Sequence, residues 1–358
     1  MNDMSKTGRA TPSPDSARLL RLPTPILFVL ANVTTAYWRG ADRRSDALFN
    51  TLLALRWMRN TYVFGKQFGY LPNYANPRSF CEKMQWRKLF DRNPLFPLLS
   101  DKIAVRDFVR DRVPEVTFPE IYWSGVDPMA IPFDDLRPPF VIKPNNRSGA
   151  NIIVRDNRSL DRRAAVRLAR KWMSSRPHNR RYGEWAYGQT RSQILIEEFL
   201  SDDGGNAPPP SYKILVFGGE VAFIYYSEGR RSGKGAVRGV YTRDWQLMPV
   251  DKWRRSGHVV LQGGMPRPKM LEDLISTASA IATGLDHVRV DLYLVGDRIY
   301  FSEATIYNYS GLEAWVAKDA EGGAAVSRSF DDAIGDNWVL PQLSRRRALK
   351  RALFNTDD

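Results

Sequence analysis

Two acidic residues, Asp291 and Glu303, lie in apolar runs on either side of a Gly296-Asp297 turn signal. Strand-forming residues around such a turn predict a β-hairpin. Two neighbouring carboxylates repel each other unless a cation lies between them, and hard oxygen ligands suit Mg²⁺ held together with substrate phosphates. We therefore interpret the hairpin as a magnesium–nucleotide site. The alternative is a solvated hairpin face with an ion pair between Arg289 and Glu303.

The register of this hairpin decides whether the two carboxylates meet. A two-residue loop would place Asp291 opposite Ser302 and would turn Glu303 to the other face, because strand side chains alternate. A three-residue loop or one bulge instead puts both acids on one face with Arg289 and Thr305. The opposite face then carries side chains that can pack on a core: Val290, Leu292, Leu294, Tyr300 and Ala304.

Three lysines precede the hairpin in the chain. Lys102 follows Asp101, the expected start of a helix, where a cation opposes the helix dipole and an anionic ligand would explain it. Lys143 ends a strand directly before a glycine-containing loop whose N–H groups could cover a phosphate. Lys213 lies on the first strand of a second hairpin around Gly218-Gly219. Each could also be an ordinary surface lysine.

Two further segments complete the candidate site. A strand of the buried type, ILIEEFL, ends in Glu197, Glu198 and Phe199. The basic run 229–239 has neither the glycine spacing of a Walker loop nor a Ser or Thr after its lysine. We interpret it as a loop that could cover an anionic substrate, with Arg238 at its end.

The composition excludes several kinds of chemistry. The chain has 358 residues, of which 43% are hydrophobic, enough for a sizeable core in two or three lobes. The single cysteine, Cys81, excludes an internal disulfide framework, and three scattered histidines leave no zinc-binding spacing. A formal net charge of +14 indicates an anionic partner, which could be a nucleotide, an acidic saccharide, a membrane surface or nucleic acid.

The helices are predicted from apolar spacing and from capping residues. Residues 45–68 predict one helix whose apolar side carries Leu48, Leu52, Leu55, Met58 and Val63. An amphipathic helix is expected after a Ser79 cap with Glu82 in its first turn, ending near Asn93-Pro94. Further helices are expected over 159–174, 270–283 and 344–354, of which the first and last are basic.

The N-terminus bears on localisation. Residues 1–22 are polar and predicted to be disordered. The apolar run 23–38 is shorter than the ~20 residues that span a bilayer and contains two prolines, and no clear signal peptide precedes it. These features favour a soluble cytoplasmic protein. Peripheral membrane contact through the N-terminus or the basic tail is the second interpretation.

In chain order these motifs resemble the ATP-grasp superfamily: FVIKP before a glycine loop, ILIEEFL, YKILVFGG, VRVDLY and YFSEAT. The run NPRSFCEKMQWRKLFDRNPLF, with the hairpin, resembles the narrower TupA-like ATP-grasp family over roughly residues 70–340. The resemblance implies an α+β fold that holds ATP between two α+β lobes, after an N-terminal helical extension. The expected parts are an N-terminal segment (1–44), a helical lobe (45–135), a central lobe (136–200), a C-terminal lobe (201–340) and a basic tail (341–358).

The resemblance also implies nucleotide-binding roles. Lys102 and Lys143 would contact the phosphates of ATP, and Lys213 would lie beside them. The end of the ILIEEFL strand would present backbone groups to adenine through Glu197, Glu198 and Phe199.

Metal-binding and catalytic roles follow from the same resemblance. Asp291 and Glu303 would bind Mg²⁺, and Arg289 would stabilise the transferred phosphoryl group or an acyl phosphate. Many ATP-grasp enzymes have Asn where this chain has Thr305, so either Thr305 or Asn308 would complete the metal ligands. The other candidate catalytic cations are Lys213 and Arg238.

These roles fit a carboxylate–amine ligase that acts through an acyl phosphate on an anionic small molecule or saccharide. The family context indicates modification of cell-surface polysaccharide. A glycosyltransferase is the first alternative, although no two aspartates lie two positions apart as an Asp-x-Asp metal site requires. A non-enzymatic anion binder is the second. Nucleic acid is not expected, because the aromatic residues lie in core-like segments.

Overall fold

The computed structural model describes residues 44–147, 149–174, 182–201, 208–229, 236–252, 259–260, 264–318, 324–326 and 328–354. The chain divides into two compact units, Met1–Asn76 and Pro77–Asp358. Almost all of the predicted N-terminal segment and the centre of the predicted basic loop, residues 230–235, lie outside the described residues. Within the described residues, no helix is long and apolar enough to cross a membrane.

In the first unit, the predicted helix over 45–68 is two helices, α3 (Arg44–Arg56) and α4 (Met58–Phe68). Trp57 separates them because its φ and ψ of −112° and 36° are not helical. α4 ends at Gly69, whose φ of 75° lies in the left-handed region that glycine adopts without a steric penalty.

The apolar side predicted for the first of these helices is wrong. Three leucines expected to pack together are 63%, 39% and 39% exposed: Leu48, Leu52 and Leu55. The face that packs instead carries Phe49 and Leu53. The reason is Asn50, which donates to Asn73 at 3.0 Å and accepts from the N–H of Ala75 at 2.9 Å. Because a buried side-chain amide needs hydrogen-bond partners, these bonds orient α3 so that the side carrying Asn50 faces the interior.

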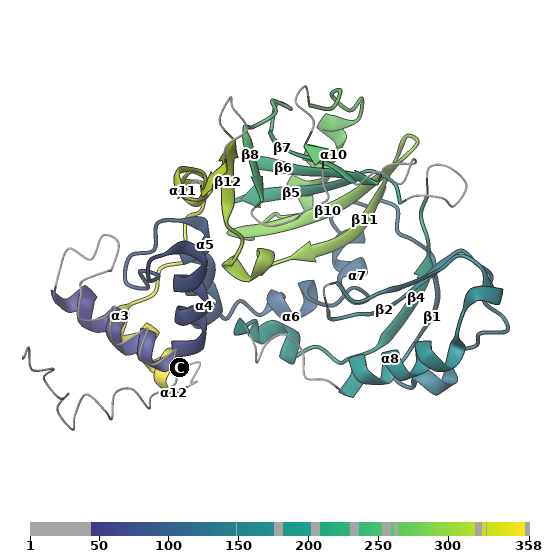
Figure 1. Cartoon of the computed structure of the whole chain (residues 1–358), viewed down its shortest axis with the longest axis horizontal. Helices are drawn as coiled ribbons and strands as arrows, with labels where there is room; N and C mark the ends of the chain where they lie inside the picture. The colour runs from purple at the N-terminus through teal and green to yellow at the C-terminus, as the bar shows by residue number, and fades with distance from the viewer. Residues whose placement is uncertain are drawn as a thin grey trace, which may run out of the picture. The chain divides into compact units, whose positions relative to one another are not determined.

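The described residues of the second unit form three sheets, with strand orders β1-β4-β2-β3, β11-β10-β5-β6-β7-β9 and β13-β12-β8 (Figure 1). All neighbouring strands are antiparallel except β7 and β9. The strands are β1 (Ile121–Gly125), β2 (Phe140–Pro144), β3 (Ile152–Val154), β4 (Ile194–Glu198), β5 (Ser211–Phe217), β6 (Glu220–Gly229), β7 (Ala236–Thr242), β8 (Val250–Lys252), β9 (Val259–Val260), β10 (His287–Val295), β11 (Arg298–Thr305), β12 (Trp315–Lys318) and β13 (Ala324–Val326).

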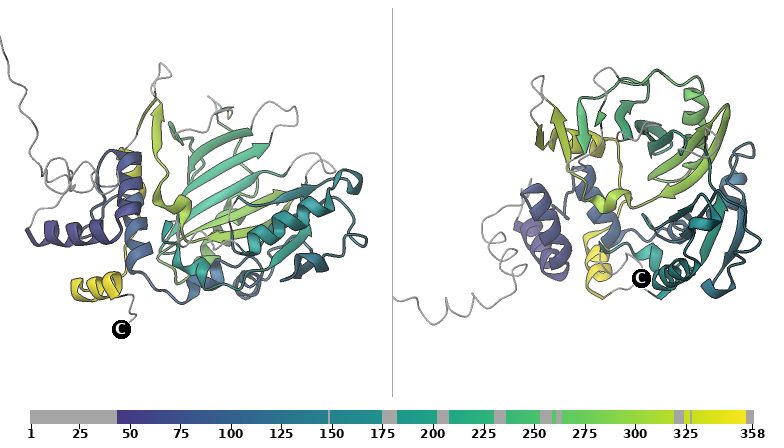
Figure 2. Two further views of the ribbon diagram at one scale, coloured as in Figure 1. Left: turned by 60° about the horizontal axis from the view of Figure 1, so that its bottom comes forward. Right: turned by 45° about the vertical axis from the view of Figure 1, so that its right-hand side comes forward.

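The described helices of this unit connect and cover the sheets. They are α5 (Phe80–Phe90), α6 (Leu95–Leu99), α7 (Val105–Arg110), α8 (Arg162–Ser174), α10 (Leu271–Ile281), α11 (Arg328–Asp336) and α12 (Arg345–Phe354), with 3₁₀ turns η1 (Pro128–Ala130), η2 (Asn157–Ser159), η3 (Trp185–Gly188) and η4 (Asn308–Gly311). The helices predicted over 159–174, 270–283 and 344–354 are confirmed as α8, α10 and α12. α10 packs on β5, β6 and β10 (Figure 2).

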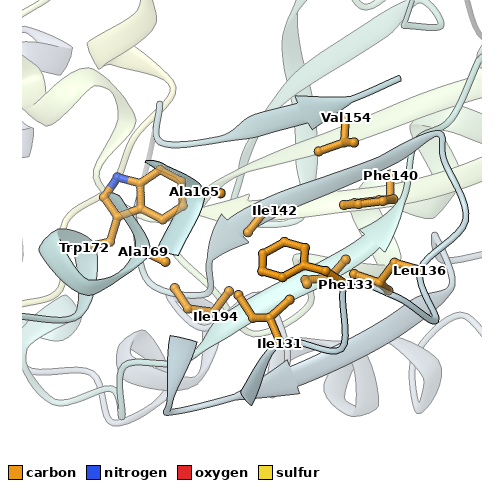
Figure 3. Packing of buried hydrophobic residues seen from close by; sticks show 11 residues of the cluster. Ile131, Phe133, Leu136, Phe140, Ile142, Val154, Ala165, Ala169, Trp172 and Ile194 are labelled. Atoms are coloured by element: carbon orange, nitrogen blue, oxygen red, sulfur yellow. The ribbon is translucent and has the colours of Figure 1, made fainter. Parts of the chain in front are cut away.

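The four-stranded sheet and α8 enclose a hydrophobic core (Figure 3). Phe140 and Ile142 of β2 and Ile194 of β4 are fully buried and pack against Ala169 and Trp172 of α8. The charged residues of α8 face away from this core, as its amphipathic pattern predicts. This packing anchors β2 and β4 to the core, and with them the residues at their ends.

The β10–β11 hairpin confirms the prediction that a bulge brings its acids together. Its loop has two residues, yet Asp291 pairs with Glu303. The next pair is Leu292 with Phe301, which leaves Ser302 as the extra residue. The bulge therefore places both carboxylates on one face, while Leu292 and Phe301 are buried on the other.

Helix α5 begins as predicted but is not amphipathic. Ser79 and Glu82 form a reciprocal capping box. Ten of its eleven residues are buried, including Arg87 and Lys88, which are 0% and 1% exposed. Both charged side chains find backbone carbonyl partners inside the unit, which makes their burial tolerable. The sequence pattern could not reveal those partners because they are about 200 residues away.

Candidate functional site

Three cations and two carboxylates meet at the β10–β11 hairpin, a set we call the ionic cluster: Lys102, Lys213, Arg289, Asp291 and Glu303. Arg289 holds Asp291 in a bidentate pair, with Nε–Oδ1 and Nη2–Oδ2 distances of 2.6 and 2.7 Å. Lys213 donates to Oδ2 of the same carboxylate at 2.5 Å. Bidentate pairs are strong and directional, so Asp291 is fixed with its oxygens on the polar face.

Glu303 links Lys102 to Arg289 in the ionic cluster. Its Oε1 accepts from Arg289 at 3.1 Å and from the Thr305 hydroxyl at 3.3 Å, and its Oε2 pairs with Lys102 at 3.2 Å. Burial would raise the pKa of Glu303, but Lys102 and Arg289 hold it below its ordinary value. Glu303 is therefore ionised at neutral pH and presents negative charge between two cations.

Lys213 also remains charged. Burial disfavours its ammonium form, yet Asp291, together with Glu303 and Tyr309, offsets this effect and raises the pKa of Lys213. The same holds for Arg289: burial opposes its charge, but Asp291, Tyr309 and Glu303 together outweigh burial and raise the pKa of Arg289. The cluster thus carries three positive and two negative charges, a surplus that suits an anionic ligand.

Lys102 is positioned by a clamp between two loops. Asp101 accepts from the N–H groups of Ile103 and Ala104, and its other oxygen accepts from Asn145 at 2.8 Å. Lys102 itself donates from its backbone to Asn145 and from Nζ to the carbonyl of Arg147 at 2.7 Å. The lysine predicted to need an anionic neighbour therefore lies in a turn before α7, where that neighbour is Glu303.

Lys143 and Glu197 form a second ionic group beside the first. Lys143 donates to one oxygen of Glu197, and Arg106 donates to the other at 2.8 Å. Burial lowers the pKa of Lys143, and Glu197 opposes this shift. Lys102 and Glu303 also act electrostatically on Lys143, so the two groups belong to one charged surface.

A cavity of about 260 Å³ opens at the end of β4. Its polar lining includes Lys143, Glu197 and Glu198, and its apolar walls include Phe199 and Tyr293. We call it the strand-end cavity. All four residues predicted to hold a nucleotide at this edge line it, so a flat aromatic group is a fitting occupant.

The backbone of the same segment is already partly engaged. The N–H of Glu198 donates to Glu120 at 2.8 Å, and that of Phe199 points to Pro139 at 3.4 Å. If this segment presents backbone groups to adenine, as predicted, those groups are not the N–H groups of Glu198 and Phe199. The Glu198 side chain accepts from the N–H of Glu120 at 3.2 Å.

A second cavity, of about 400 Å³, opens at the other end of the ionic cluster. Arg289, Glu303 and Thr305 form part of its wall. The rest of the wall is rich in tyrosine and includes one further carboxylate, that of Glu184. Its residues are Tyr182, Glu184, Tyr187, Tyr307, Tyr309, Ser310 and Leu312. We call it the tyrosine cavity. The ionic cluster thus lies between two cavities of different character.

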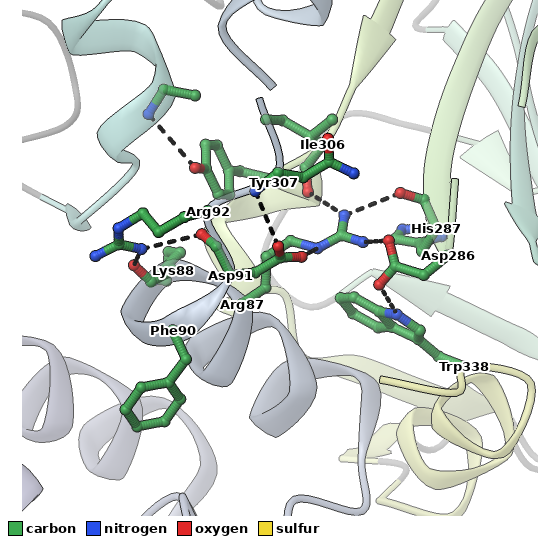
Figure 4. Close-up of polar contacts among 12 residues, drawn as sticks. Arg87, Lys88, Phe90, Asp91, Arg92, Asp286, His287, Ile306, Tyr307 and Trp338 are labelled. Atoms are coloured by element: carbon green, nitrogen blue, oxygen red, sulfur yellow. Dashed lines mark hydrogen bonds and ion pairs between the residues drawn. The ribbon is translucent and has the colours of Figure 1, made fainter. Parts of the chain in front are cut away.

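The wall of the tyrosine cavity is anchored by Arg87 (Figure 4). This guanidinium donates to the carbonyls of His287 and Ile306 at 2.9 and 3.0 Å and to Asp286 at 2.5 Å. Asp286 also accepts from Trp338 at 2.8 Å. Because Ile306 directly precedes Tyr307, the network fixes the start of the segment that lines the cavity.

Arg238, the remaining predicted residue, lies on β7. The cross-strand pairs Tyr293–Ser211, Ser211–Ser227 and Ser227–Arg238 place it on the polar face of the six-stranded sheet. Its strand is two removed from that of Lys213, a separation of about 10 Å. Arg238 therefore lies on the same face of the sheet as the ionic cluster, to one side of it.

The oxygen donors of the hairpin fit magnesium. Two carboxylates and the Thr305 hydroxyl share the face, and Oδ1 of Asn308 accepts from Arg289 at 2.7 Å. These are hard ligands of the kind that Mg²⁺ takes together with phosphate oxygens. Among the described residues, no three His, Cys, Asp or Glu side chains are grouped to hold a metal by themselves. A metal here would share its coordination with a ligand.

Four contributors to the site were not predicted from the sequence: Lys88, Arg106, Asn145 and Glu184. Lys88 and Arg106 lie in helices and look like ordinary surface cations in a periodic pattern. Glu184 lies between a basic stretch and a short 3₁₀ turn, where no strand or helix period points to it. The tyrosine-rich run after β11 is the one signal that could have indicated a cavity wall.

A family model described as TupA-like ATP-grasp matches residues 82–336. D-alanine–D-alanine ligase from Bacillus anthracis is 15% identical, with 58% of this chain and 57% of that chain covered and a TM-score of 0.34. The ATP-grasp ligase PsnB is 13% identical, with 68% and 62% covered and a TM-score of 0.36. L-amino acid ligase from Bacillus licheniformis is 16% identical, with 60% and 44% covered and a TM-score of 0.35.

The match therefore spans less than two thirds of the length of each of these ligases. No curated protein sequence matches the chain.

Proposed function

Because the chain belongs to the TupA-like ATP-grasp family, we propose that it is an ATP- and Mg²⁺-dependent carboxylate–amine ligase. The observation that carries this proposal is the ionic cluster between two cavities. Adenine would occupy the strand-end cavity, and the triphosphate would run along Lys143, Lys102 and Lys213. The γ-phosphate would then lie near Arg289 and Glu303, at the mouth of the tyrosine cavity.

The chemistry follows from charge. A substrate carboxylate oxygen attacks the γ-phosphorus, the bond to ADP breaks, and an acyl phosphate forms. An amine nitrogen then attacks the acyl carbon and phosphate leaves, giving an amide. The protein's cations would bind and orient the phosphates and neutralise charge that develops during transfer, and Arg289 lies beside the proposed γ-phosphate position. Bound Mg²⁺, held by Asp291, Glu303 and Thr305 or Asn308, would supply further neutralisation.

We place the substrate among acidic saccharides or polymers of the cell envelope. The net charge of +14 supports an anionic partner. A cytoplasmic location suits an enzyme that consumes ATP. Release of ADP that depends on both a carboxylate and an amine tests the activity, with glucuronic acid and galacturonic acid as carboxylates and L-alanine and glucosamine as amines. Failure of the purified protein to bind ATP with Mg²⁺ would overturn the proposal.

Lys143→Met is expected to weaken ATP binding on the order of 10²-fold, because a buried cation at the phosphate path is lost. Isothermal titration with a non-hydrolysable ATP analogue and Mg²⁺ measures the effect. Lys171→Met, on the exposed side of α8, is the matched control and should bind like the wild type. Equal affinities of the two variants would contradict the placement of the triphosphate.

We also propose that the first unit contacts anionic membrane surfaces through α3. The exposed leucines Leu48, Leu52 and Leu55 recur at helical spacing. Exposed cations flank them at Arg56 and Arg59, and the one acidic residue within 44–76, Asp46, is buried. Apolar area combined with positive charge is the pattern that binds an anionic bilayer interface.

Replacing the three leucines by serine is expected to reduce binding to phosphatidylglycerol vesicles roughly tenfold or more, because the apolar contribution is lost. Co-sedimentation measures the bound fraction, and vesicles of neutral phosphatidylcholine are the control for charge. Unchanged binding of the triple variant would show that α3 is not the contact.

A further inference from the structure

The tyrosine cavity contains a carboxylate that the phosphate chemistry does not use. Glu184 lines the cavity and is 7% exposed. It does not belong to the ionic cluster, whose members pair with one another. A buried carboxylate facing a cavity is costly unless it has a partner or a ligand.

The surroundings hold Glu184 in place without filling its acceptor capacity. The Ser310 side chain hydrogen-bonds to it. Lys88 lies close enough to act on it electrostatically, but its Nζ donates to the carbonyl of Ser310 at 2.9 Å and contacts the Ser310 hydroxyl at 3.3 Å. A carboxylate can accept about four hydrogen bonds. Glu184 can thus receive donors from a ligand while the Ser310 hydrogen bond holds its position.

Burial raises the pKa of Glu184, although Lys88 and the Ser310 hydrogen bond oppose the shift. Burial likewise lowers the pKa of Lys88 to about 8, against the pull of Glu184. The carboxylate is therefore a better proton acceptor than a solvated glutamate.

The rest of the cavity favours a cationic group beside Glu184. Four tyrosine rings contribute to its wall, and ring faces attract ammonium ions. The guanidinium in the wall, Arg289, is already engaged by Asp291, Glu303 and Asn308. An anionic ligand in this cavity would therefore be repelled by the Glu184 carboxylate. An ammonium ion would instead be attracted by that carboxylate and by the tyrosine rings.

We propose that the tyrosine cavity is the binding site of the amine acceptor, and that Glu184 binds its ammonium and removes a proton from it. This inference rests on the proposed function. It adds which of the two substrates of the proposed ligase enters the cavity beside the γ-phosphate.

The ammonium gives one proton to the Glu184 carboxylate and becomes a neutral amine. Its nitrogen lone pair forms the bond to the acyl carbon, and the bond from that carbon to the phosphate oxygen breaks with its electrons on phosphate. The second N–H proton goes to the departing phosphate. Glu184 then releases its proton to solvent as product leaves.

Two assays on the same protein separate this role from the ligase activity itself. Hydroxylamine is neutral near neutral pH and traps an acyl phosphate as a hydroxamate without needing a base. Formation of an amide from L-alanine or glucosamine, which are ammonium ions at that pH, needs one. Both assays use ATP, Mg²⁺ and glucuronic acid.

Glu184→Gln is expected to form hydroxamate at a rate within about twofold of the wild type and to lose amide formation by on the order of 10²-fold or more. Glu184→Asp, which keeps the charge beside Lys88, is expected to raise the KM for the amine roughly tenfold because the carboxylate is withdrawn. The control is Glu272→Gln, an exposed residue paired with Arg267 on the surface, which should behave like the wild type in both assays.

Amide formation by Glu184→Gln within about threefold of the wild type would overturn the assignment. A raised KM for glucuronic acid with an unchanged ratio of amide to hydroxamate would also overturn it, because the cavity would then hold the carboxylate. If Glu184→Gln does not fold, an unchanged amine KM in Glu184→Asp overturns the assignment. Absence of hydroxamate with the wild type would instead overturn the ligase proposal, and this assignment with it.

Discussion

Glu303→Gln is expected to abolish ligase turnover, with a fall in kcat/KM on the order of 10³-fold. The side chain carries the negative charge between Lys102 and Arg289, and it is one of the two carboxylates that we propose bind magnesium. Glutamine has nearly the same volume but brings no charge. Initial rates of ADP release over a range of ATP concentrations measure the loss, and the dependence of residual activity on Mg²⁺ concentration tests the metal role.

The variant should remain folded, because its neighbours keep partners: Arg289 retains Asp291 and Asn308, and Lys102 retains the carbonyl of Arg147. A thermal midpoint close to that of the wild type checks this. Glu272→Gln serves as the control with the same chemical change on the surface. Full activity of Glu303→Gln would exclude the carboxylate from the site, and unfolding would assign it a structural role.

Arg87→Met is expected to destabilise the protein by about 3–5 kcal/mol, the cost of breaking a buried ion pair by removing one partner. Arg87 is 0% exposed and donates to Asp286 and to two backbone carbonyls. Its guanidinium also lies 4.4 Å from the ring centroid of Trp338. Methionine leaves these acceptors without their donor. Urea unfolding followed by tryptophan fluorescence measures the change in the free energy of unfolding.

A double-mutant cycle sharpens this prediction. Adding Asp286→Asn to Arg87→Met should cost less than the sum of the single changes, because the second substitution removes the stranded charge. Arg267→Met breaks an exposed ion pair and should change stability by less than about 1 kcal/mol. Strict additivity of the two buried substitutions would contradict a direct Arg87–Asp286 interaction as the source of the cost.

The family was recognisable from ordered local motifs, and the family model confirms it. Such motifs survive because each one is a strand or turn whose residue types are dictated locally: a glycine turn, a lysine at a strand end, acids on a hairpin. The α+β class and the bulge-dependent register of Asp291 and Glu303 could be predicted for this reason. Alternation on a strand leaves few ways to bring both acids onto one face.

Helices were less predictable than strands here. The pattern around Leu48, Leu52 and Leu55 looks like a packing face, but the tertiary partners of Asn50 bury the other side. Likewise α5 carries charged residues at spacings typical of a solvated face, yet Arg87 and Lys88 are buried. A polar side chain can face the interior whenever distant carbonyls satisfy it, and periodicity holds no information about those carbonyls.

The sequence by itself therefore determined the family, the fold class and the residues of the hairpin. Only the tertiary structure decided what lies around them: the Asn145 clamp on Lys102, the pairing of Glu197 with Arg106 and Lys143, and the tyrosine cavity with Glu184. The physical reason is the distance along the chain over which each interaction acts. Turn chemistry and strand alternation act between near neighbours in the chain, whereas ion pairs and cavities join residues that the chain brings together only when it folds.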